Sequence, residues 1–351
     1  MFNIPITESE YRQYPAFSYS LLSKFKKKGF AGLQSVFTEE TESTPSLLLG
    51  SIVDTLLTEG ESAYNLKFCV GDSSTEVSDT TQKAVSMLYT QFGTTYSSIE
   101  EISHDHLERV LNEANYRMSW RLATRIEKIK MDGQPLYDFY IKTQNKTVVP
   151  ADIDLKAREM VASLKSHEVT KHIFNKNPFC TTKQLFQVKC STEFNGVPYK
   201  CMFDNIEINV EKKTIQPRDL KTTSKSAWDF PANLIDYNYD LQAELYTMIL
   251  HKELPEEYKD YTILPFQFIV IDTMEKKPVM WTWEHRCDKN TTLYYINDIL
   301  FYNPLYLGTL LNAYKTQYLN NSLDTPMNKN RCDNNIIQTL INYGSNQTKQ
   351  L

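Results

Sequence analysis

The stretch Asp219-Leu220-Lys221-Thr222 carries side chains whose types and spacing suit the hydrolysis of a phosphodiester bond. It closes a strand-like segment, and the strand-like segment before it carries Asp204. Carboxylates bind hard cations, and an ammonium group two residues after one of them lies on the same face of a strand. A lysine in that place can act on the water that attacks phosphorus. The spacing therefore predicts a metal-dependent nuclease site at the end of a strand.

A β-hairpin is predicted just before this stretch. Residues 184–194 and 197–210 have strand-like sequences, and Asn195-Gly196 between them is a strong signal for a two-residue turn. Directly opposite partners in a ladder point to the same side, and side chains along a strand alternate. This turn therefore places Glu193 on the face that also carries Asp204.

A third strand is expected over about 214–221, and its register depends on the loop before it. With a two-residue loop at Lys212-Lys213, Asp204 lies opposite Lys221, and the acidic groups and the lysine converge on one surface. With a three-residue loop the third strand turns over, and its side chains leave that surface. A solvated sheet face without a metal is the alternative for these residues.

A divalent cation fits the predicted surface. The carboxylates of Glu193, Asp204 and Asp219 on one face repel one another unless a cation neutralises them. Mg²⁺ or Mn²⁺ suits an oxygen-rich site with an open position, where it polarises a phosphoryl oxygen and lowers the pKa of a bound water. The Leu220 carbonyl is a further candidate ligand. Lys221 is expected to orient the water or to neutralise charge in the transition state.

Asp54 is another candidate ligand. It lies in a nearly apolar helix predicted from about Pro45 to Gly60, and a helix apolar around most of its circumference is usually buried. A carboxylate half inside an apolar face is costly unless a metal or another group compensates it. An edge position that faces water is the alternative, and the sequence leaves both open.

Gln242 and Tyr246 are four residues apart in a predicted helix, so they share a helix face. The glutamine is a candidate for binding a phosphate or the attacking water, and the tyrosine for stacking or positioning. A structural helix with a tyrosine in the core is the alternative.

Two groups of residues are candidates for contacts with DNA. The basic run from Lys24 to Lys28 follows the start of a helix capped by Ser18 or Ser20, and such a run can bind backbone phosphates. A solvated helix end is the alternative.

The second group is aromatic. Trp228 and either Tyr237 or Tyr239 can stack on bases near a DNA end. A position in the core is the alternative for these side chains.

The predicted elements indicate an α/β fold with a mixed central sheet flanked by helices. Further helices are expected near 80–92, 104–114, 118–131, 150–166, 233–251 and 288–320. Further strands are expected at Thr262–Ile271 and Val279–Glu284. We expect one integrated domain, or one domain with an added subdomain, divided into a mostly helical part over 1–178, a core over 179–320 and a loosely ordered polar tail over 321–351.

Composition sets the broad class. Of the 351 residues 41% are apolar and 23% charged, which argues against global disorder. The net charge of −5 means that a nucleic-acid binder must concentrate positive charge locally. The six cysteines lack C-x-x-C spacing, so zinc and iron–sulfur sites have little support, and free thiols in a cytoplasm are expected. No signal peptide or membrane-spanning run is visible. The many Lys, Asn, Tyr and Ile residues hint at an AT-rich genome, such as that of a phage or its host.

The chain resembles the PD-(D/E)XK nuclease superfamily, and within it the exonuclease VIII (RecE-like) and RecB-type branch. The resemblance covers about residues 15–285, and its matching stretches are Ser18–Leu22, Leu49–Asp54, Met202–Asp204, Asp219–Thr223 and Tyr239–Tyr246. The last of these contains a Q-x-x-x-Y motif, which together with the D-x-K stretch is the most specific part of the match. The family's first motif usually carries histidine as a metal ligand, and Asp54 takes its place here.

The resemblance implies a restriction-endonuclease-like core in which Asp204, Asp219 and the Leu220 carbonyl hold Mg²⁺ or Mn²⁺, with Lys221 as the catalytic lysine. It implies an exonuclease that acts on duplex ends in recombination or DNA processing, as a homo-oligomer with a single-strand annealing protein as partner, in the cytoplasm of a cell or phage host. An endonuclease or nickase of the same fold, or a catalytically weak DNA-binding module, are the alternatives.

Overall fold

The computed structural model describes residues 1–29, 44–71, 77–143, 146–175, 181–287, 292–296 and 298–321. The chain divides into two compact units, the first made of residues 1–58 and 159–351 and the second of residues 59–158. This division differs from the boundary expected near residue 178. The difference arises because the second unit is an insertion within the helical N-terminal part, and the chain belongs to the first unit both before and after it.

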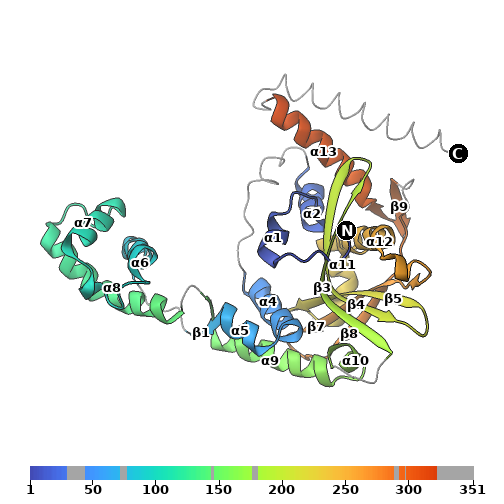
Figure 1. Ribbon diagram of the computed structural model, residues 1–351, viewed down its shortest axis with the longest axis horizontal. Helices are drawn as coiled ribbons and strands as arrows, with labels where there is room; N and C mark the ends of the chain where they lie inside the picture. Colours follow the sequence, from blue (N-terminus) through green and yellow to red (C-terminus); the bar gives the residue numbers. More distant parts are fainter. Residues whose placement is uncertain are drawn as a thin grey trace. The chain divides into compact units, whose positions relative to one another are not determined.

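The first unit is built on a mixed sheet, which confirms the predicted fold class (Figure 1). Its strands lie in the order β3-β4-β5-β7-β8, and the short β6 pairs with β5. The ladder between β5 and β7 is parallel, whereas β3–β4, β4–β5 and β7–β8 are antiparallel. The strands are β3 Thr182–Phe194, β4 Val197–Asn209, β5 Thr214–Thr223, β6 Thr262–Ile263, β7 Phe266–Asp272 and β8 Val279–Trp283.

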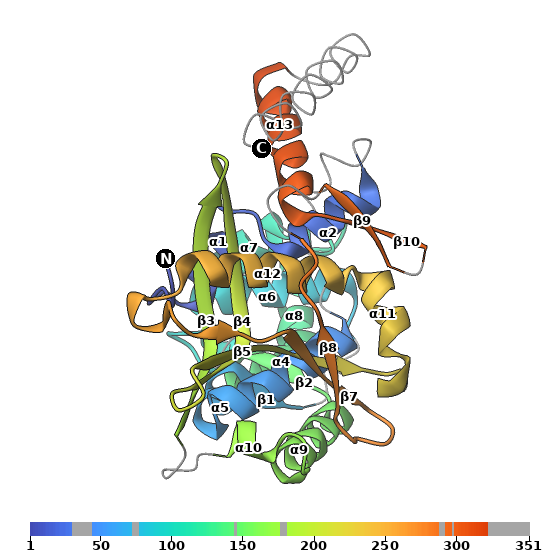
Figure 2. The same cartoon turned by 90° about the vertical axis from the view of Figure 1, so that its right-hand side faces the viewer.

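Helices flank this sheet, and α12 runs across β3 and β4 (Figure 2). On α12 every side chain from Asp240 to Leu250 is buried, so this helix forms the centre of the first unit's core. The helices are α1 Glu8–Gln13, α2 Tyr19–Lys28, α4 Pro45–Thr58, α10 Lys171–Phe174, α11 Phe230–Tyr237, α12 Tyr239–Glu253 and α13 Pro304–Asn321. Helix α9, Ala151–Ser166, begins in the second unit and ends in the first.

The second unit has its own hydrophobic core, formed where α6, α7 and α8 pack together. Leu88, Leu107 and Ile129 contribute to it and are fully buried. The elements of this unit are α5 Glu61–Lys67, β1 Phe68–Val70, α6 Asp79–Phe92, α7 His104–Glu113, α8 Leu122–Thr143 and β2 Thr147–Val149. Strands β1 and β2 pair in parallel. Among the residues that the structure describes, no helix of either unit is both long and apolar enough to span a membrane.

The β3–β4 hairpin has the predicted two-residue turn and register, but it bends where Gln187 faces Asp204. The ladder skips this pair, although the pairs on both sides keep the same register. Gln187 has a φ of 52°, in the left-handed region that few non-glycine residues adopt. The bend changes which side chains of β4 enter the core. These are Val197, Tyr199, Cys201 and Phe203 before it, and Ile206 and Ile208 after it.

The register between β4 and β5 corrects the sequence-based expectation. Asn209 pairs with Thr214, so the loop has four residues and not two. The pairing therefore shifts by two residues, which keeps the face of each β5 side chain but changes its partner. The ladder ends at the pair Asn205–Arg218, and its register continued by one residue sets Asp204 opposite Asp219 and not opposite Lys221.

Two predicted helices are also corrected. The helix expected over 233–251 is two helices, α11 and α12, separated at Asn238, which adopts the left-handed conformation with φ 55°. Part of the helix expected over 288–320 is instead a hairpin of β9 Leu293–Ile296 and β10 Ile299–Tyr302, because aromatic side chains such as Tyr294 and Phe301 stack across it. The tail beyond residue 321 lies outside the described residues.

Candidate active site

The end of β5 joins the central motif to helix α12. Gln242 donates from Nε2 to Asp219 Oδ1 over 2.5 Å, and its Oε1 accepts from Lys221 Nζ over 2.9 Å. Lys221 Nζ also lies 2.6 Å from Asp219 Oδ2. Asp219 and Gln242 are only 4% and 3% exposed, so this closed set of contacts is largely removed from water. The glutamine thus fixes the relative position of the carboxylate and the ammonium.

The environment keeps Lys221 charged. Burial by itself disfavours an ammonium, but Asp219 and, to a smaller degree, Tyr239 outweigh it, so the pKa of Lys221 is raised above its ordinary value. The Tyr239 ring lies with its centroid 4.4 Å from Lys221 Nζ, a cation–π contact. A protonated lysine in this position can stabilise negative charge, and it is not a candidate for a general base.

Asp204 lies beside Asp219 at the bend of β4. Its Oδ2 accepts a 2.7 Å hydrogen bond from the backbone N–H of Leu220, which ties the bend to β5. Burial raises the pKa of Asp204 well above its ordinary value, and the carboxylates of Asp219 and Asp54 add to the shift. The site therefore holds more negative charge than Lys221 neutralises.

Helix α4 approaches β5 from the side opposite α12. Side chains of β5 alternate, so Lys221 faces α12 and Thr222 faces α4. A Cβ at Gly50 would lie 3.2 Å from Thr222 Oγ1, so glycine permits this close approach. One turn further along α4, Asp54 accepts from Gln187 Nε2 at 2.9 Å on each carboxylate oxygen. The bend of β3 thus supplies the amide that holds the third acidic group.

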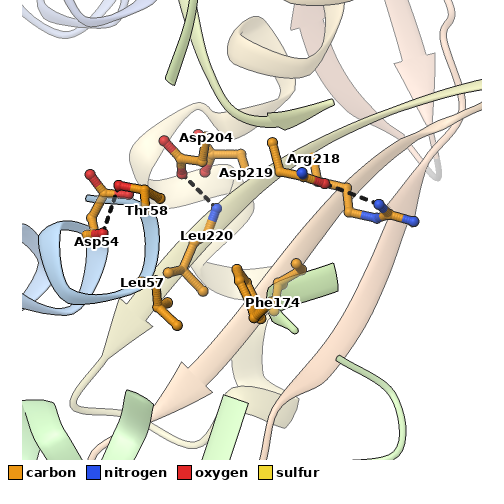
Figure 3. Close-up of a pocket in the computed structure, with 10 residues that line it drawn as sticks. Asp54, Leu57, Thr58, Phe174, Asp204, Arg218, Asp219 and Leu220 are labelled. Carbon is orange, nitrogen blue, oxygen red and sulfur yellow. Dashed lines mark hydrogen bonds between the residues drawn. The ribbon is translucent and has the colours of Figure 1, made fainter. Parts of the chain in front are cut away.

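A small pocket, partly open to solvent, lies between these elements (Figure 3). Asp204 and Asp219 lie side by side above Leu220, and Asp54 lies on the α4 side of the pocket (Figure 3). Phe174 of α10 and Ile269 of β7 are among the apolar residues that close it. The pocket is therefore lined by three carboxylates together with apolar side chains.

The described residues suit an ion such as Mg²⁺ or Mn²⁺, which needs few protein ligands, better than an ion that protein side chains must surround completely. Among them, no three Asp, Glu, His or Cys side chains are gathered closely enough to hold a metal ion by themselves. Mg²⁺ needs only one or two carboxylates, because it keeps several waters and takes a substrate phosphate as a further ligand. Asp204 and Asp219 supply oxygen donors of that kind, and the mutual repulsion of the carboxylates is what a cation would relieve.

Two predicted catalytic residues lie apart from this cluster. Glu193 is exposed near the hairpin turn, and its partner Pro198 is six positions from Asp204 along β4, roughly 20 Å. Its backbone carbonyl accepts from Lys252 Nζ. The alternation argument placed Glu193 on the correct face in principle but ignored the length of the strand, so Glu193 does not belong to the site.

Tyr246 lies in the core beneath the site. Its ring contacts Phe203 edge-on at 5.1 Å between centroids and Phe266 at 6.1 Å. It is 7% exposed, and burial raises the pKa of its hydroxyl well above the ordinary value. This matches the core alternative for Tyr246 and leaves little surface for stacking with a base.

The candidates for DNA contacts lie at α2, just before α11 and at the start of α12, all in the first unit. Ser18 caps α2 by accepting from the Leu21 N–H over 3.4 Å, whereas Ser20 is exposed. Lys24 is half-buried in the same helix. Trp228 is 67% exposed. Tyr239 is half-buried, because its ring stacks between other aromatic rings.

Gln187 is a site residue that the sequence does not reveal. It reads as an ordinary polar position in a strand, and neither its left-handed backbone nor its contact with Asp54 has a signature in composition or periodicity. Strained backbone at a non-glycine residue costs about 1–3 kcal/mol and persists where surrounding structure enforces it. Here the side chain of the strained residue holds a candidate metal ligand.

Replacing Gln187 with glycine tests this role. Glycine relieves the left-handed strain, so the free energy of unfolding is expected to stay within about 1 kcal/mol of the wild-type value or to rise. The affinity for Mn²⁺ and any cleavage activity are expected to fall roughly 10- to 100-fold, because Asp54 loses its anchor. Asn195→Gly is the matched control, since Asn195 has a φ of 51° in the hairpin turn. Equal Mn²⁺ affinity in both variants would remove Gln187 from the site.

Comparisons with families, curated proteins and solved structures give different results. The chain matches no protein-family model, and no curated protein matches it. Among solved structures, a proposed exonuclease from Eubacterium rectale is similar over 80% of this chain and 79% of its own, with a TM-score of 0.40 and 15% identity. At that score and identity the function has to be argued from the site itself.

Proposed function

We propose that this chain is a metal-dependent deoxyribonuclease that hydrolyses phosphodiester bonds at the end of β5. The observation that carries the proposal is the buried set of contacts among Asp219, Lys221 and Gln242, with Asp204 beside it. A carboxylate pair that lines a pocket, with an ammonium bound to one of the two carboxylates, supplies groups that phosphodiester hydrolysis requires. The resemblance of the D-x-K and Q-x-x-x-Y stretches to the PD-(D/E)XK superfamily supports the same reaction.

The proposed roles of the chain's own residues follow from their contacts. Lys221, held by Gln242 and Asp219, stabilises the charge that builds up on the phosphorus oxygens in the transition state. Gln242 positions the lysine by accepting from its Nζ. The Leu220 N–H fixes the orientation of Asp204 toward the pocket.

Asp204 and Asp219 would hold Mg²⁺ or Mn²⁺, with the Leu220 carbonyl and Asp54 as further candidate ligands. The ion would polarise the phosphoryl oxygen and lower the pKa of the attacking water. Gln187, by holding both oxygens of Asp54, would keep that carboxylate turned toward the pocket.

Within this class we propose an exonuclease that acts at DNA ends, as the RecE-like resemblance suggests. Its substrate would be DNA with free ends. The same resemblance suggests that the chain forms a homo-oligomer and that an annealing protein is its partner.

Cleavage assays with linear and covalently closed circular DNA test the proposal. In Mg²⁺ or Mn²⁺, linear DNA is expected to be degraded progressively while closed circles survive, and EDTA is expected to stop the reaction. Cleavage of circles would instead identify an endonuclease of the same chemistry. DNA binding without cleavage in either ion would overturn the assignment and favour a binding module.

A further inference from the structure

A strip of aromatic rings connects the proposed catalytic lysine to the surface of α11. The Tyr239 ring that contacts Lys221 stacks on Tyr237 with centroids 5.6 Å apart, and on Phe230 with centroids 5.7 Å apart. Tyr239 is therefore covered by other rings. Tyr237, at the outer end, is 49% exposed.

The other end of the strip is also exposed. Phe230, which is 2% exposed, packs on Trp281, and Trp281 in turn contacts Trp228. Trp228 is 67% exposed, although it is a large apolar side chain. The strip thus has a buried middle beside the proposed active site and two exposed aromatic ends.

The backbone beneath Tyr237 is held in place. Its carbonyl accepts hydrogen bonds from the Tyr19 hydroxyl at 2.8 Å and from Ser23 Oγ at 3.3 Å. The next residue, Asn238, is left-handed and donates to Ser23 Oγ at 2.9 Å. Helix α2 therefore fixes the backbone of the turn that presents Tyr237, at the last residue of α11.

Positive charge accompanies the exposed ring. Lys27 Nζ, in the basic last turn of α2, lies 5.3 Å from the Tyr237 ring centroid. An exposed aromatic face with an ammonium beside it matches a nucleotide, whose base is planar and whose phosphate is anionic. The net charge of the chain is −5, so this local positive charge is a feature of the surface and not of the whole protein.

We propose that Tyr237 and Trp228 are a stacking platform for unpaired bases of the strand that is cleaved. The inference rests on the proposed nuclease function and specifies its substrate as DNA whose strand is separated from its complement near the site. The faces of bases inside a duplex are covered by their neighbours, whereas an unpaired base can stack on the part of the Tyr237 ring that is exposed. Its phosphate then lies within reach of Lys27, and the backbone leads toward Lys221.

Binding measurements in EDTA test the platform without cleavage. Fluorescence anisotropy of labelled oligothymidylate is expected to show affinity for Tyr237→Ala that is roughly 5- to 150-fold weaker than for the wild-type chain, the range for losing one stacked base. Tyr237→Phe keeps the ring and is expected to bind like the wild type. Tyr295→Ala is the matched control, since Tyr295 is 69% exposed on β9.

Two further probes separate stacking from a structural effect. An abasic oligomer of the same length is expected to bind the wild type and Tyr237→Ala equally, because it has phosphates but no bases. A blunt hairpin duplex is expected to bind both proteins equally as well. An equal loss of affinity on abasic, single-stranded and duplex probes would overturn the platform, as would unchanged oligothymidylate binding by Tyr237→Ala.

The outcomes distinguish this inference from the proposed function. If the wild-type chain cleaves DNA but Tyr237→Ala binds oligothymidylate as tightly as the wild type, the platform is refuted and the proposed nuclease function stands. Base-dependent binding through Tyr237 in a chain that cleaves no DNA would refute the nuclease, and with it the claim that the bound strand is the one cleaved.

Discussion

Replacing Lys221 with methionine is expected to lower DNA cleavage by roughly 10²- to 10³-fold, the loss typical of removing one group that stabilises transition-state charge. Methionine keeps most of the side-chain volume but removes the ammonium that Gln242 and Asp219 hold. Initial rates on linear duplex and on single-stranded DNA in saturating Mn²⁺ measure the effect. Lys225→Met is the matched control, because Lys225 is exposed just past the end of β5.

A loss of stability must be separated from the loss of chemistry. Lys221→Met leaves the buried Asp219 carboxylate without the ammonium that neutralises it, and breaking a buried ion pair in this way costs about 3 kcal/mol. The double variant Asp219→Asn with Lys221→Met removes both charges, so its unfolding midpoint is expected to recover toward the wild-type value. Its cleavage activity is expected to stay lost. Recovery of activity together with stability would show that Lys221 has a structural role only.

The parts of the fold that follow from local patterns were predictable. The turn at Asn195-Gly196 was correct because that dipeptide favours a left-handed conformation, and the structure has Asn195 at φ 51° and Gly196 at φ 75°. Helix α4 was also correct, because its apolar run has no competing strand signal. In both cases one short stretch of sequence contains all of the information that fixes the structure.

The corrections share a different physical cause. The four-residue loop before Thr214 is set by the pairing of β4 with β5, and its own sequence does not determine its length. The break at Asn238 depends on Ser23 of α2, to which the Asn238 side chain donates. The contact between Asn238 and Ser23 joins residues 215 positions apart in the chain, so no window of sequence contains it.

The candidate site shows the same division. The D-x-K spacing places Asp219 and Lys221 on one face of a strand whatever the rest of the fold, so their proximity followed from alternation alone. The role of Gln242 as a bridge between them, and of Gln187 as the anchor of Asp54, needed the packing of α12 and the bend of β3. The prediction that Glu193 belongs to the site was wrong for a different reason, because two residues on one face of a sheet can still lie far apart along a strand.

Replacing Asp204 with asparagine is expected to stabilise the protein in the absence of a divalent ion and to leave it less stable than the wild type when the ion is present. Without metal, burial and the neighbouring carboxylates of Asp219 and Asp54 raise the pKa of Asp204, so the ionised group opposes folding at neutral and higher pH. Asparagine removes that charge and can still accept from the Leu220 N–H. In EDTA at pH 8 the variant is therefore expected to unfold at a higher temperature than the wild type.

The pH dependence of this gain has a definite direction. A carboxyl whose pKa is raised in the folded state stabilises the fold fully below its ordinary pKa of about 4, and it loses that contribution as pH rises through the folded value. The advantage of Asp204→Asn is therefore expected to vanish near pH 4 and to grow toward pH 8. Asp229→Asn is the control, since Asp229 is exposed on the surface.

Adding Mn²⁺ is expected to invert the order. An ion at 100 times its dissociation constant stabilises the wild type by about 2.7 kcal/mol, which for a unit of this size is a shift of roughly 5–10 °C in the unfolding midpoint. Asp204→Asn lacks a ligand and is expected to shift little. Unfolding midpoints of both proteins in EDTA and in Mn²⁺ show whether the order of their stabilities is inverted. An equal Mn²⁺ shift in the two proteins would place the ion elsewhere, and the proposed nuclease would then lose the carboxylate around which its site is arranged.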